Sequence, residues 1–349
     1  MALHELKQRL KKGTLRVMAR FGLDRVFRHL NRDKLLVVMY HGVTSKCYYP
    51  PIWTQLPVEI FRSQLEFLRD HYRVVTLPEV IAAVEGKGIL PERAALITFD
   101  DGIKNNFSVA FPVLQELGLP AGIFLTVDLV GSTELFWFDE LYLLVQEGCR
   151  LGVPLDLMGK GANEHYQRGE IWNAYTSCVE SVKRAGSVTR DTLLERLRRE
   201  VPIEREPWLE DFGLLNWDDV AVMEGSGLVS FGVHTATHRI LSELEDHELV
   251  AEVLNPRQKM SSKTVGDAAS FCFPNGRPGV DFHPRHQDFL RECGYRCAFT
   301  TKNELFDWRG GEPMGIGRVP AGNDCTSDPC YFSLSTSGAV RFFRRFTGA

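Results

Sequence analysis

The chain has 349 residues, of which 25% are charged and 44% are hydrophobic, values typical of a globular protein large enough to bury a substantial core. Its net charge of −4 gives no basis for nucleic-acid binding, which relies on clustered positive charge. No apolar run approaches the roughly 20 residues that cross a bilayer, and the basic N-terminus lacks the apolar core of a secretory signal. We therefore expect a cytoplasmic protein whose eight scattered cysteines are mainly reduced.

The N-terminal segment, residues 1–32, is basic and amphipathic. Its first 30 residues carry eight Lys or Arg against Glu5 and Asp24, with apolar residues between the charges. This pattern predicts one or two amphipathic helices. They would either pack on the domain with a solvated basic face or contact anionic lipid at the inner face of the membrane. The C-terminal tail, residues 336–349, contains Arg-Phe-Phe-Arg-Arg-Phe and is predicted to join the same face.

Residues 33–130 alternate between predicted strands and predicted helices. Short apolar runs typical of buried strands are separated by segments with apolar residues at helical spacing. The strands are predicted at residues 35–40, 74–75, 94–99 and 121–127, and the helices at 57–71, 78–84 and 106–117. This alternation indicates a largely parallel sheet with helical crossovers, and therefore an α/β fold.

The alternation breaks at about residue 131. Residues 131–212 are polar and helical in pattern, with an amphipathic helix predicted at 189–200 and capped by Thr189. We interpret this region as a helical insertion. Trp137 lies in a Phe-Trp-Phe-Asp run near its start. The aromatic residues of this run either line a substrate cleft or anchor the insertion to the core, and the sequence leaves both interpretations open.

The strand pattern resumes in residues 213–335. Strands are predicted at residues 228–233, 269–273, 297–300 and 316–319, and helices at 245–260 and 287–293. We interpret this region as the second part of the α/β domain that residues 33–130 begin. His283 and His286 lie in a Pro-containing stretch and are predicted to be surface residues.

Three predicted strands end in polar side chains that are suited to catalysis or metal binding. In chain order these side chains are His41, Asp100 with Asp101, and His234 with His238. Taken alone, Asp-Asp-Gly is often a turn with an Asx cap, and a His-x3-His pair is often structural. Because the carboxyl ends of parallel strands lie at one edge of a sheet, we expect all five side chains to lie close together.

This set of side chains is suited to metal-assisted hydrolysis. Two imidazoles and one carboxylate, from His234, His238 and Asp101, form a ligand set for a divalent ion that leaves positions open for water and substrate. Such an ion polarises a carbonyl group and activates water. Asp100 is then the candidate general base, and His41 is the candidate general acid for a departing amine. The reaction expected is hydrolysis of an amide or an ester.

Four segments resemble a known family. They are Met-Tyr-His-Gly-Val at 39–43, Thr-Phe-Asp-Asp-Gly at 98–102, His-Thr-Ala-Thr-His at 234–238 and Phe-Cys-Phe-Pro-Asn-Gly at 271–276. Together they resemble the motifs of the polysaccharide deacetylases, also called the NodB-homology group or carbohydrate esterase family 4. The first segment is similar to that of the subgroup that deacetylates poly-N-acetylglucosamine. The resemblance covers about residues 35–130 and 226–320.

The resemblance implies a distorted (β/α) barrel of about seven strands and removal of N-acetyl groups from a hexosamine-containing glycan. The substrate would be an N-acetylated sugar or a lipid-linked or nucleotide-linked precursor of a cell-surface polysaccharide. Asp101, His234 and His238 would bind one divalent ion, zinc foremost, with cobalt, nickel or manganese as alternatives. Asp100 would act as the base and His41 as the acid.

The third segment of the family, here residues 271–276, implies further residues of the site. Pro274 and Asn275 would form one wall of the substrate groove, with the backbone N–H of Asn275 donating to the oxyanion. Many family members carry an arginine in this segment that orients the base, and this chain has none there. Arg318 is expected to take that role from the last strand, or else only to neutralise a buried carboxylate.

Two alternatives for the function remain open at this point. One is a glycan-binding protein that keeps the metal cleft without catalysis. The other is a hydrolase of a non-sugar amide on the same scaffold. The sequence indicates no oligomeric state.

Overall fold

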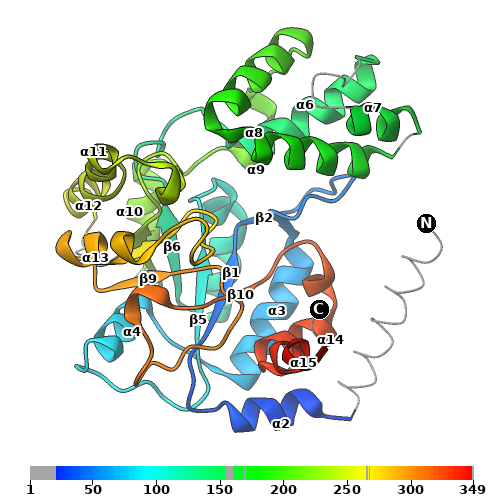
Figure 1. The fold of residues 1–349 in the computed structure, drawn as a ribbon. Coiled ribbons are helices and arrows are strands. Elements are labelled where there is room, and N and C mark those ends of the chain that lie inside the picture. The colour runs from blue at the N-terminus through cyan, green and yellow to red at the C-terminus, as the bar shows by residue number, and fades with distance from the viewer. Residues whose placement is uncertain (1–20, 154–159, 169, 265, 267, 348–349) are drawn as a thin grey trace. The chain divides into compact units, whose positions relative to one another are not determined.

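The structure, a computed structural model, describes residues 21–153, 160–168, 170–264, 266 and 268–347 (Figure 1). Residues 1–20, which make up most of the predicted N-terminal amphipathic segment, lie outside the described residues. The chain divides into two compact units. Unit 1 comprises Met1–Lys46, Trp53–Ser132 and Leu215–Ala349, and unit 2 comprises Cys47–Ile52 and Thr133–Leu214. None of the helices among the described residues is both long and apolar enough to cross a membrane.

Unit 1 is built around an eight-stranded sheet in which every paired strand is parallel. Its strands are β1 (Leu36–Tyr40), β4 (Arg73–Val74), β5 (Ala94–Phe99), β6 (Ala121–Leu125), β7 (Val229–Val233), β8 (Ser270–Cys272), β9 (Cys297–Phe299) and β10 (Val319–Pro320). Their order is β10-β1-β5-β6-β7-β8-β9, and β4 pairs with the first residues of β5. The strands therefore follow one another around the sheet almost in chain order.

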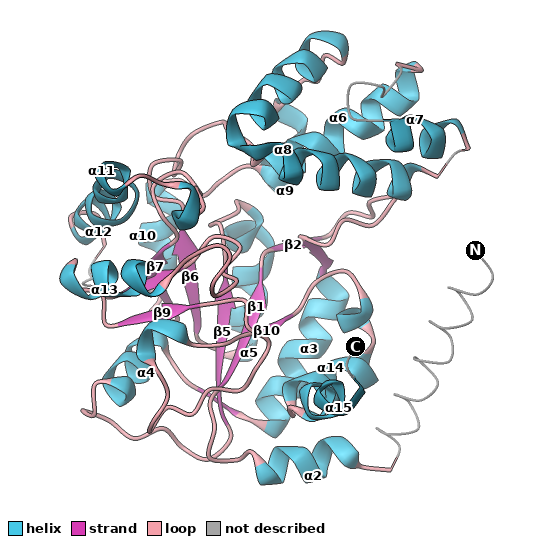
Figure 2. Cartoon of the chain, viewed as in Figure 1, coloured by secondary structure: helices cyan, strands magenta, loops and turns pink. Residues whose placement is uncertain are grey.

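The two ends of this sheet are joined through the segment that leads into β10. Ile316 forms a parallel bridge with Phe299 of β9, and Val319 pairs with Val38 of β1. The sheet therefore curls on itself, with helices around it (Figure 2). This arrangement confirms the predicted distorted (β/α) barrel with seven strands along its path.

Both faces of the barrel strands are buried. In β5, Ile97 and Phe99 pack with the helices outside the barrel, whereas Leu96 packs with residues of the neighbouring strands such as Val37 and Phe124. A strand buried on both faces needs apolar residues at nearly every position, not at alternate ones. This requirement explains why residues 94–99 form a continuous apolar run that identifies the strand directly.

The helices of unit 1 mostly confirm the predicted positions, and two of them contain unpredicted π-helical turns. The helices are α2 (Leu23–Leu30), α3 (Val58–His71), α4 (Leu77–Val84), α5 (Phe111–Leu117), α10 (Trp217–Gly225), α11 (Asp246–Leu249), α12 (Asn255–Ser261), α13 (Pro284–Glu292), α14 (Pro329–Thr336) and α15 (Ala339–Thr347). The predicted helix 106–117 begins with the π-helical turn η1 (Asn106–Ala110). The predicted helix 245–260 is interrupted by a second such turn, η5 (Val250–Leu254).

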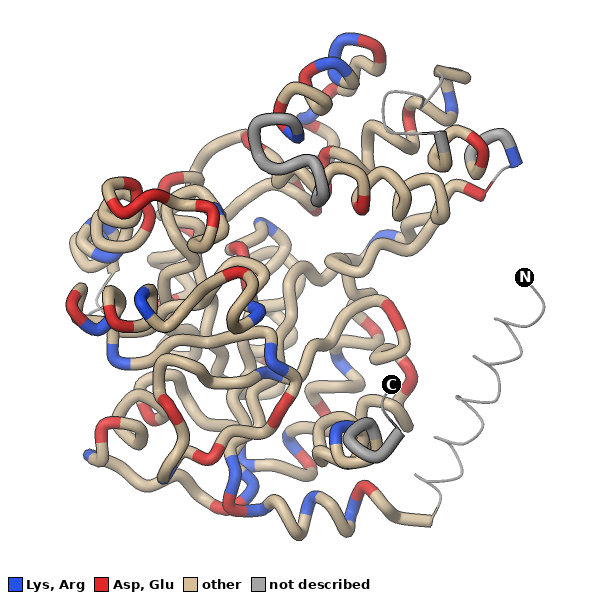
Figure 3. The backbone as a smooth tube through the Cα atoms, viewed as in Figure 1, with Lys and Arg blue, Asp and Glu red and all other residues tan. Residues whose placement is uncertain are grey.

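The N-terminal and C-terminal segments of the described chain pack together. In α2, Asp24 accepts hydrogen bonds from Arg28 (2.8 Å) and from Ser333 of α14 (2.6 Å). The ring of Phe27 lies 5.0 Å from that of Phe342 in α15. Lys and Arg outnumber Asp and Glu along α2 (Figure 3), yet Arg28 is buried and is not part of a solvated basic face.

His286 is buried, so its prediction as a surface residue is wrong. It lies in the first turn of α13, a helix that begins at Pro284 and not at residue 287. Its Nδ1 accepts a hydrogen bond from the backbone N–H of His283 at 3.0 Å, an interaction that caps the helix. Because the sequence pattern placed these residues in a loop, it gave no reason to bury the ring.

Unit 2 is helical. Its elements are α6 (Trp137–Leu151), α7 (Lys160–Gln167), α8 (Ile171–Glu200), η3 (Glu206–Trp208) and α9 (Leu209–Phe212). The predicted start of a helix at Thr189 is wrong, because α8 begins at Ile171. Ala174, Cys178 and Val182 are buried at a spacing of four residues, so the apolar face extends upstream of Thr189.

Candidate metal centre and active site

Asp101, His234 and His238 converge at one edge of the barrel. Asp101 follows β5, and the two histidines follow β7. The Nε2 atoms of His234 and His238 each lie 3.4 Å from Oδ1 of Asp101. Both carboxylate oxygens of Asp101 are buried, and neither has a hydrogen-bond partner among the described residues. A buried carboxylate without partners, next to two imidazole nitrogens, fits a divalent cation such as zinc.

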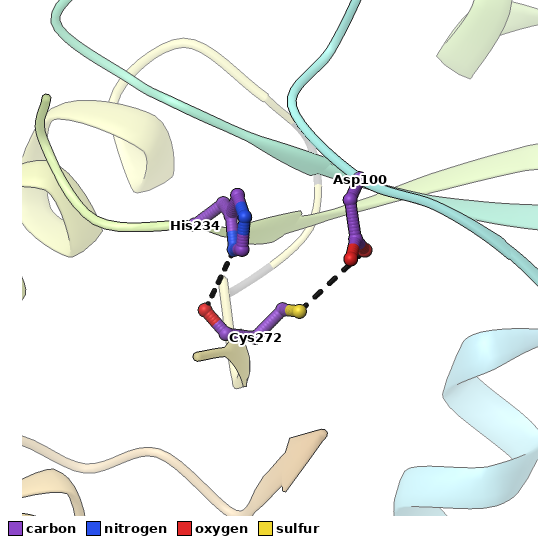
Figure 4. A group of neighbouring side chains, drawn as sticks. All are labelled: Asp100, His234 and Cys272. Atoms are coloured by element: carbon purple, nitrogen blue, oxygen red, sulfur yellow. Dashed lines mark hydrogen bonds between the residues drawn. The ribbon is translucent and has the colours of Figure 1, made fainter. Parts of the chain in front are cut away.

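The ring of His234 is held in the orientation that a metal ligand needs. Its Nδ1 lies 2.8 Å from the backbone carbonyl oxygen of Cys272 (Figure 4). A carbonyl oxygen only accepts, so Nδ1 carries the proton and donates it to this bond. The lone pair of Nε2 then points toward Asp101. Such a contact on the far nitrogen commonly fixes the tautomer of a metal-binding histidine.

Several residues around the site have left-handed backbone conformations. The φ values are 73° at Asp101, 63° at Thr235, 64° at His238 and 57° at Asn275. These conformations are uncommon for residues other than glycine and cost on the order of 1–3 kcal/mol each, and they tend to gather at functional sites. Their concentration after β5, β7 and β8, at one edge of the barrel, marks this edge as the candidate active site.

Asp100 forms a buried ion pair with Arg318. Its Oδ1 and Oδ2 accept hydrogen bonds from Nη1 and Nη2 of Arg318 at 2.6 and 2.7 Å. The Nε of the fully buried guanidinium donates to the carbonyl oxygen of Thr300 at 3.1 Å. Burial raises the pKa of Asp100, but the Arg318 guanidinium outweighs burial and leaves the pKa below its usual value. Asp100 is therefore ionised at neutral pH and able to accept a proton.

Cys272 also contacts Asp100 and was not predicted as part of the site. Its thiol lies 3.5 Å from Oδ1 of Asp100 and is fully buried (Figure 4). Burial raises the pKa of Cys272, so the thiol is neutral and can donate a weak hydrogen bond to the carboxylate. Its position could have indicated a role in the site, because Cys272 ends β8 in the segment where many members of the family carry an arginine and this chain does not.

His41 faces the other oxygen of Asp101. Its Nε2 lies 3.9 Å from Oδ2 of Asp101, and its backbone carbonyl accepts a 2.7 Å hydrogen bond from Nδ2 of Asn106 in η1. Its ring lies 4.8 Å from that of Trp53, which no sequence motif singled out. Burial lowers the pKa of His41, and the carboxylates of Asp101 and Asp100 act against that effect.

A small second sheet lies next to His41 and was not predicted. Strand β2 (Gly42–Thr44) pairs in parallel with β3 (Gln55–Pro57). The Asn105 side chain joins the two strands by accepting from the N–H of Val43 at 3.1 Å and donating to Gln55 at 2.7 Å. This arrangement fixes the backbone on the carboxyl side of His41.

Asn275 lies in a tight turn after β8, next to the buried Pro274. The carbonyl oxygen of Asn275 accepts a 2.5 Å hydrogen bond from the Thr301 hydroxyl. At Gly276, where φ is +66°, a Cβ atom would lie 3.0 Å from Phe273 O and Thr301 N. The turn is therefore closely packed. The assignment of the Asn275 backbone N–H to an oxyanion remains a prediction.

Trp137 lies in unit 2, at the first position of α6. Its ring lies 5.6 Å from that of Phe138, and the Arg190 guanidinium lies 5.4 Å from the centre of the Trp137 ring. These are contacts within unit 2. The predicted role of Trp137 in a substrate cleft stays a prediction.

Part of the chain matches a known protein family. A family model described as polysaccharide deacetylase matches residues 195–298, a segment that contains His234 and His238. This match agrees with the resemblance of the four motifs to the polysaccharide deacetylases. Asp100, Asp101 and Arg318 lie outside the matched segment, and the barrel brings them to the same site as the two histidines.

Individual relatives of this chain are named as N-deacetylases. The chain is 28% identical over 183 residues to a poly-beta-1,6-N-acetyl-D-glucosamine N-deacetylase of Staphylococcus epidermidis, covering 48% of this chain and 57% of that protein. It is 38% identical over 61 residues to the enzyme of the same name from Escherichia coli K12, covering 17% of this chain and 9% of that protein. The chain thus spans about half the length of the first curated relatives it matches.

Solved structures share the fold of this chain. The deacetylase PplD of Streptococcus pyogenes, solved in complex with acetate, matches with a TM-score of 0.56 and 14% identity, covering 86% of this chain and 98% of that chain. IcaB of Ammonifex degensii matches with a TM-score of 0.55 and 20% identity, covering 86% and 97% of the two chains. At these identities the likeness concerns the fold.

Proposed function

We propose that this protein is a metal-dependent N-deacetylase that acts on a hexosamine-containing glycan or its precursor in cell-surface polysaccharide biosynthesis. The observation that carries the proposal is the site itself. An ionised buried carboxylate, Asp100, lies beside a cluster of Asp101, His234 and His238 whose donor atoms are all within 4.8 Å of one another. The names of the relatives support a poly-N-acetylglucosamine-like substrate.

Asp101, His234 and His238 would hold the ion, and Asp100, His41 and Asn275 would handle protons and charge. A bound zinc ion, or cobalt, nickel or manganese, would supply Lewis-acid activation of water and of the acetyl carbonyl. In the proposed reaction Asp100 accepts one proton of the attacking water as the new C–O bond forms. His41 donates a proton to the amide nitrogen as the C–N bond breaks, so the products are acetate and a free amine.

Arg318 and Asn275 would complete the site. Arg318 donates a hydrogen bond to each carboxylate oxygen of Asp100, so the carboxylate is held in one orientation before substrate binds. The backbone N–H of Asn275 would donate to the oxyanion that develops on the acetyl carbonyl. Both groups act without changing their own charge.

The first experiment is elemental analysis of the purified protein and of a His234→Ala/His238→Ala double variant. We expect about one zinc-like ion per chain in the wild type and loss of that ion in the variant. Acetate release from N-acetylglucosamine oligomers is then measured on the metal-loaded protein. A wild type that stays metal-free after reconstitution with zinc, cobalt and nickel would contradict the proposed mechanism at its first step.

An Asp100→Asn variant separates catalysis from binding. The amide keeps the shape of the carboxylate but cannot act as a base at neutral pH. We expect zinc content to be retained and acetate release to fall by about 10²–10⁴-fold, the usual contribution of a general base. Unchanged activity in this variant would exclude Asp100 as the base and would favour another proton acceptor.

We further propose that the protein meets a lipid-linked substrate at the cytoplasmic face of the inner membrane through α2 and α15. Phe21, Val26, Leu30 and Phe342 are exposed apolar residues, and Arg25 is exposed beside them. Apolar residues among basic ones suit an anionic lipid surface. We expect co-sedimentation with phosphatidylglycerol vesicles but not with phosphatidylcholine vesicles, and reduced binding after Val26→Gln/Leu30→Gln substitution. Equal sedimentation of wild type and variant would contradict this contact.

A further inference from the structure

The loop that carries the two histidines is held by a buried carboxylate outside the ligand set. Glu252 lies in the π-helical turn η5 and is only 5% exposed. Its Oε2 accepts hydrogen bonds from the backbone N–H groups of Ala236 (3.1 Å) and Thr237 (3.0 Å). Its Oε1 accepts from the Thr237 hydroxyl at 2.6 Å. One side chain therefore satisfies three donors of the segment between His234 and His238.

This segment needs external support because its backbone is strained. Thr235 and His238 both have positive φ values, 63° and 64°. Such a conformation is a clear outlier for a β-branched residue such as Thr235. Strained residues persist only where surrounding interactions determine the conformation. The two N–H groups that Glu252 binds lie between the two strained residues, so the carboxylate acts at the point where the loop would otherwise relax.

Glu252 lies in a π-helical turn that places it next to the loop. The turn η5 lies between α11 and α12, and its Val253 carbonyl accepts a 2.8 Å hydrogen bond from the buried Tyr295 hydroxyl. The backbone carbonyl of Glu252 itself accepts from the N–H of Ala236 at 3.1 Å. Single π-helical turns within helices are rare and occur frequently at functional sites. Here the turn places both a backbone and a side-chain acceptor against the loop.

We propose that Glu252 is a positioning residue of the metal centre. By fixing the backbone between His234 and His238, it holds both imidazoles in reach of the same ion. It is not a member of the proposed ligand set of Asp101, His234 and His238. This inference rests on the proposed metal-dependent function, because the loop's two histidines are the proposed ligands.

The test compares zinc affinity, measured by chelator competition, across a series of variants. Glu252→Ala removes all three side-chain bonds, and we expect zinc to bind about 10–100-fold more weakly, as is usual when a supporting partner of a metal ligand is lost. Glu252→Gln can still accept both N–H groups through its amide oxygen and donate to the Thr237 hydroxyl, so its affinity should stay within a few-fold of wild type. Thr237→Val removes only the hydrogen bond from the Thr237 hydroxyl, so its zinc affinity should lie between those of Glu252→Ala and wild type. Thr237→Ser should match wild type.

A second readout does not depend on the metal. Hydrogen exchange of peptides spanning residues 234–240 is followed by mass spectrometry in the metal-free protein. We expect faster exchange in Glu252→Ala than in Glu252→Gln or wild type, because the Thr237 N–H loses its acceptor and the Ala236 N–H keeps only the backbone carbonyl of residue 252. If Glu252→Ala does not fold, the Glu252→Gln and Thr237→Val variants still decide the question by their order of affinity.

The outcomes separate the two proposals. A wild type that binds no zinc would overturn the proposed function, and the exchange measurement would still test the loop. Equal zinc affinity and equal exchange in wild type and Glu252→Ala would overturn the role of Glu252. A Glu252→Gln variant that loses as much affinity as Glu252→Ala would show that charge matters and positioning does not, which would also overturn the inference.

Discussion

At the scale of single residues, the pairing of Asp100 with Arg318 dominates the site. Both side chains are buried, and the guanidinium donates to both carboxylate oxygens. Burying two charges costs a large desolvation free energy, which is recovered only when the geometry is good and other polar atoms are satisfied. Here Arg318 also donates to the carbonyl of Thr300. The pair therefore keeps an ionised carboxylate inside the barrel, as a base requires.

Replacing Arg318 by alanine is expected to lower the free energy of unfolding by about 3–5 kcal/mol, because it leaves Asp100 charged, buried and unpaired. Urea denaturation measures this change. The double variant Arg318→Ala/Asp100→Asn should regain part of that stability but no deacetylation, because the buried charge and the base are both gone. An Arg318→Ala variant as stable as wild type would show that the pair is not buried in solution.

At the scale of elements, close packing between neighbouring strands sets which residues the strands can carry. In β7, a Cβ atom at Gly232 would lie 2.5 Å from the Phe124 ring of β6 and 2.5 Å from the Ser270 hydroxyl of β8. Real Cβ atoms do not approach so closely, so only glycine fits there. Gly232 lies two residues before His234. Packing at Gly232 therefore also affects the position of His234.

We expect Gly232→Ala to destabilise the protein by about 1–3 kcal/mol, the usual cost of overpacking a core, and to weaken zinc binding. Gly225, at the end of α10, is the matched control, because a Cβ atom there would meet nothing within 4 Å beyond the adjacent residues and the backbone of its own helix, and its φ is not positive. Gly225→Ala should be neutral or stabilising by up to about 1 kcal/mol. Thermal and urea unfolding compare the two. Equal effects would contradict the close approach at Gly232.

We expect the free energy of unfolding to depend on pH because of His286, which is buried in the first turn of α13. Burial lowers the pKa of His286 to about 4, below its usual value of 6.5. Between these two values the unfolded chain binds a proton that the folded chain does not, so stability is lost as pH falls from about 6.5 to about 4. The loss is at most about 1.4 kcal/mol per pH unit.

Urea unfolding at a series of pH values checks this expectation. His286→Asn is the matched variant, since its Oδ1 can accept the same bond from the N–H of His283 without titrating. The free energy of unfolding should fall less steeply with decreasing pH in the variant than in wild type. Parallel pH profiles would show that His286 titrates normally in the folded protein.

At the scale of the whole molecule, the two units have separate hydrophobic cores. The cores of unit 1 surround the barrel strands, whereas α6 and α8 of unit 2 pack on each other around residues such as Leu141, Leu144 and Leu197. The proposed metal ligands all belong to unit 1. A ligand that binds only one folded unit stabilises that unit by mass action.

We therefore expect zinc to raise the stability of unit 1 and not that of unit 2. At a free concentration about 100 times its Kd, zinc should add about 2.7 kcal/mol. Hydrogen exchange in urea, followed on peptides from β5 and from the first half of α8, reports the two units separately with zinc and with a chelator. Equal stabilisation of both peptides would mean that the units unfold together or that zinc binds elsewhere.

The barrel strands and the side chains at their ends could be predicted from the sequence alone. Strands β5 (Ala94–Phe99) and β7 (Val229–Val233) lie in a largely buried parallel sheet, and this environment demands local apolar runs that stand out along the chain. The polar residues that follow them are conspicuous for the same reason. The resemblance of four short, local motifs to a known family then suggested the proposed reaction.

Which distant groups support that site depends on the three-dimensional path of the chain. Arg318 was expected beside a buried carboxylate, and the structure shows it donating to both oxygens of Asp100 across 218 positions of the chain. The contact of the Glu252 carboxylate with the loop of His238, made from a π-helical turn, was not predicted. The burial of His286 and the early start of α8 were likewise missed. Local periodicity reports which face of an element is apolar. It does not report which buried charged residues, distant in the sequence, come into contact in the folded chain. Those contacts determine how the site is supported.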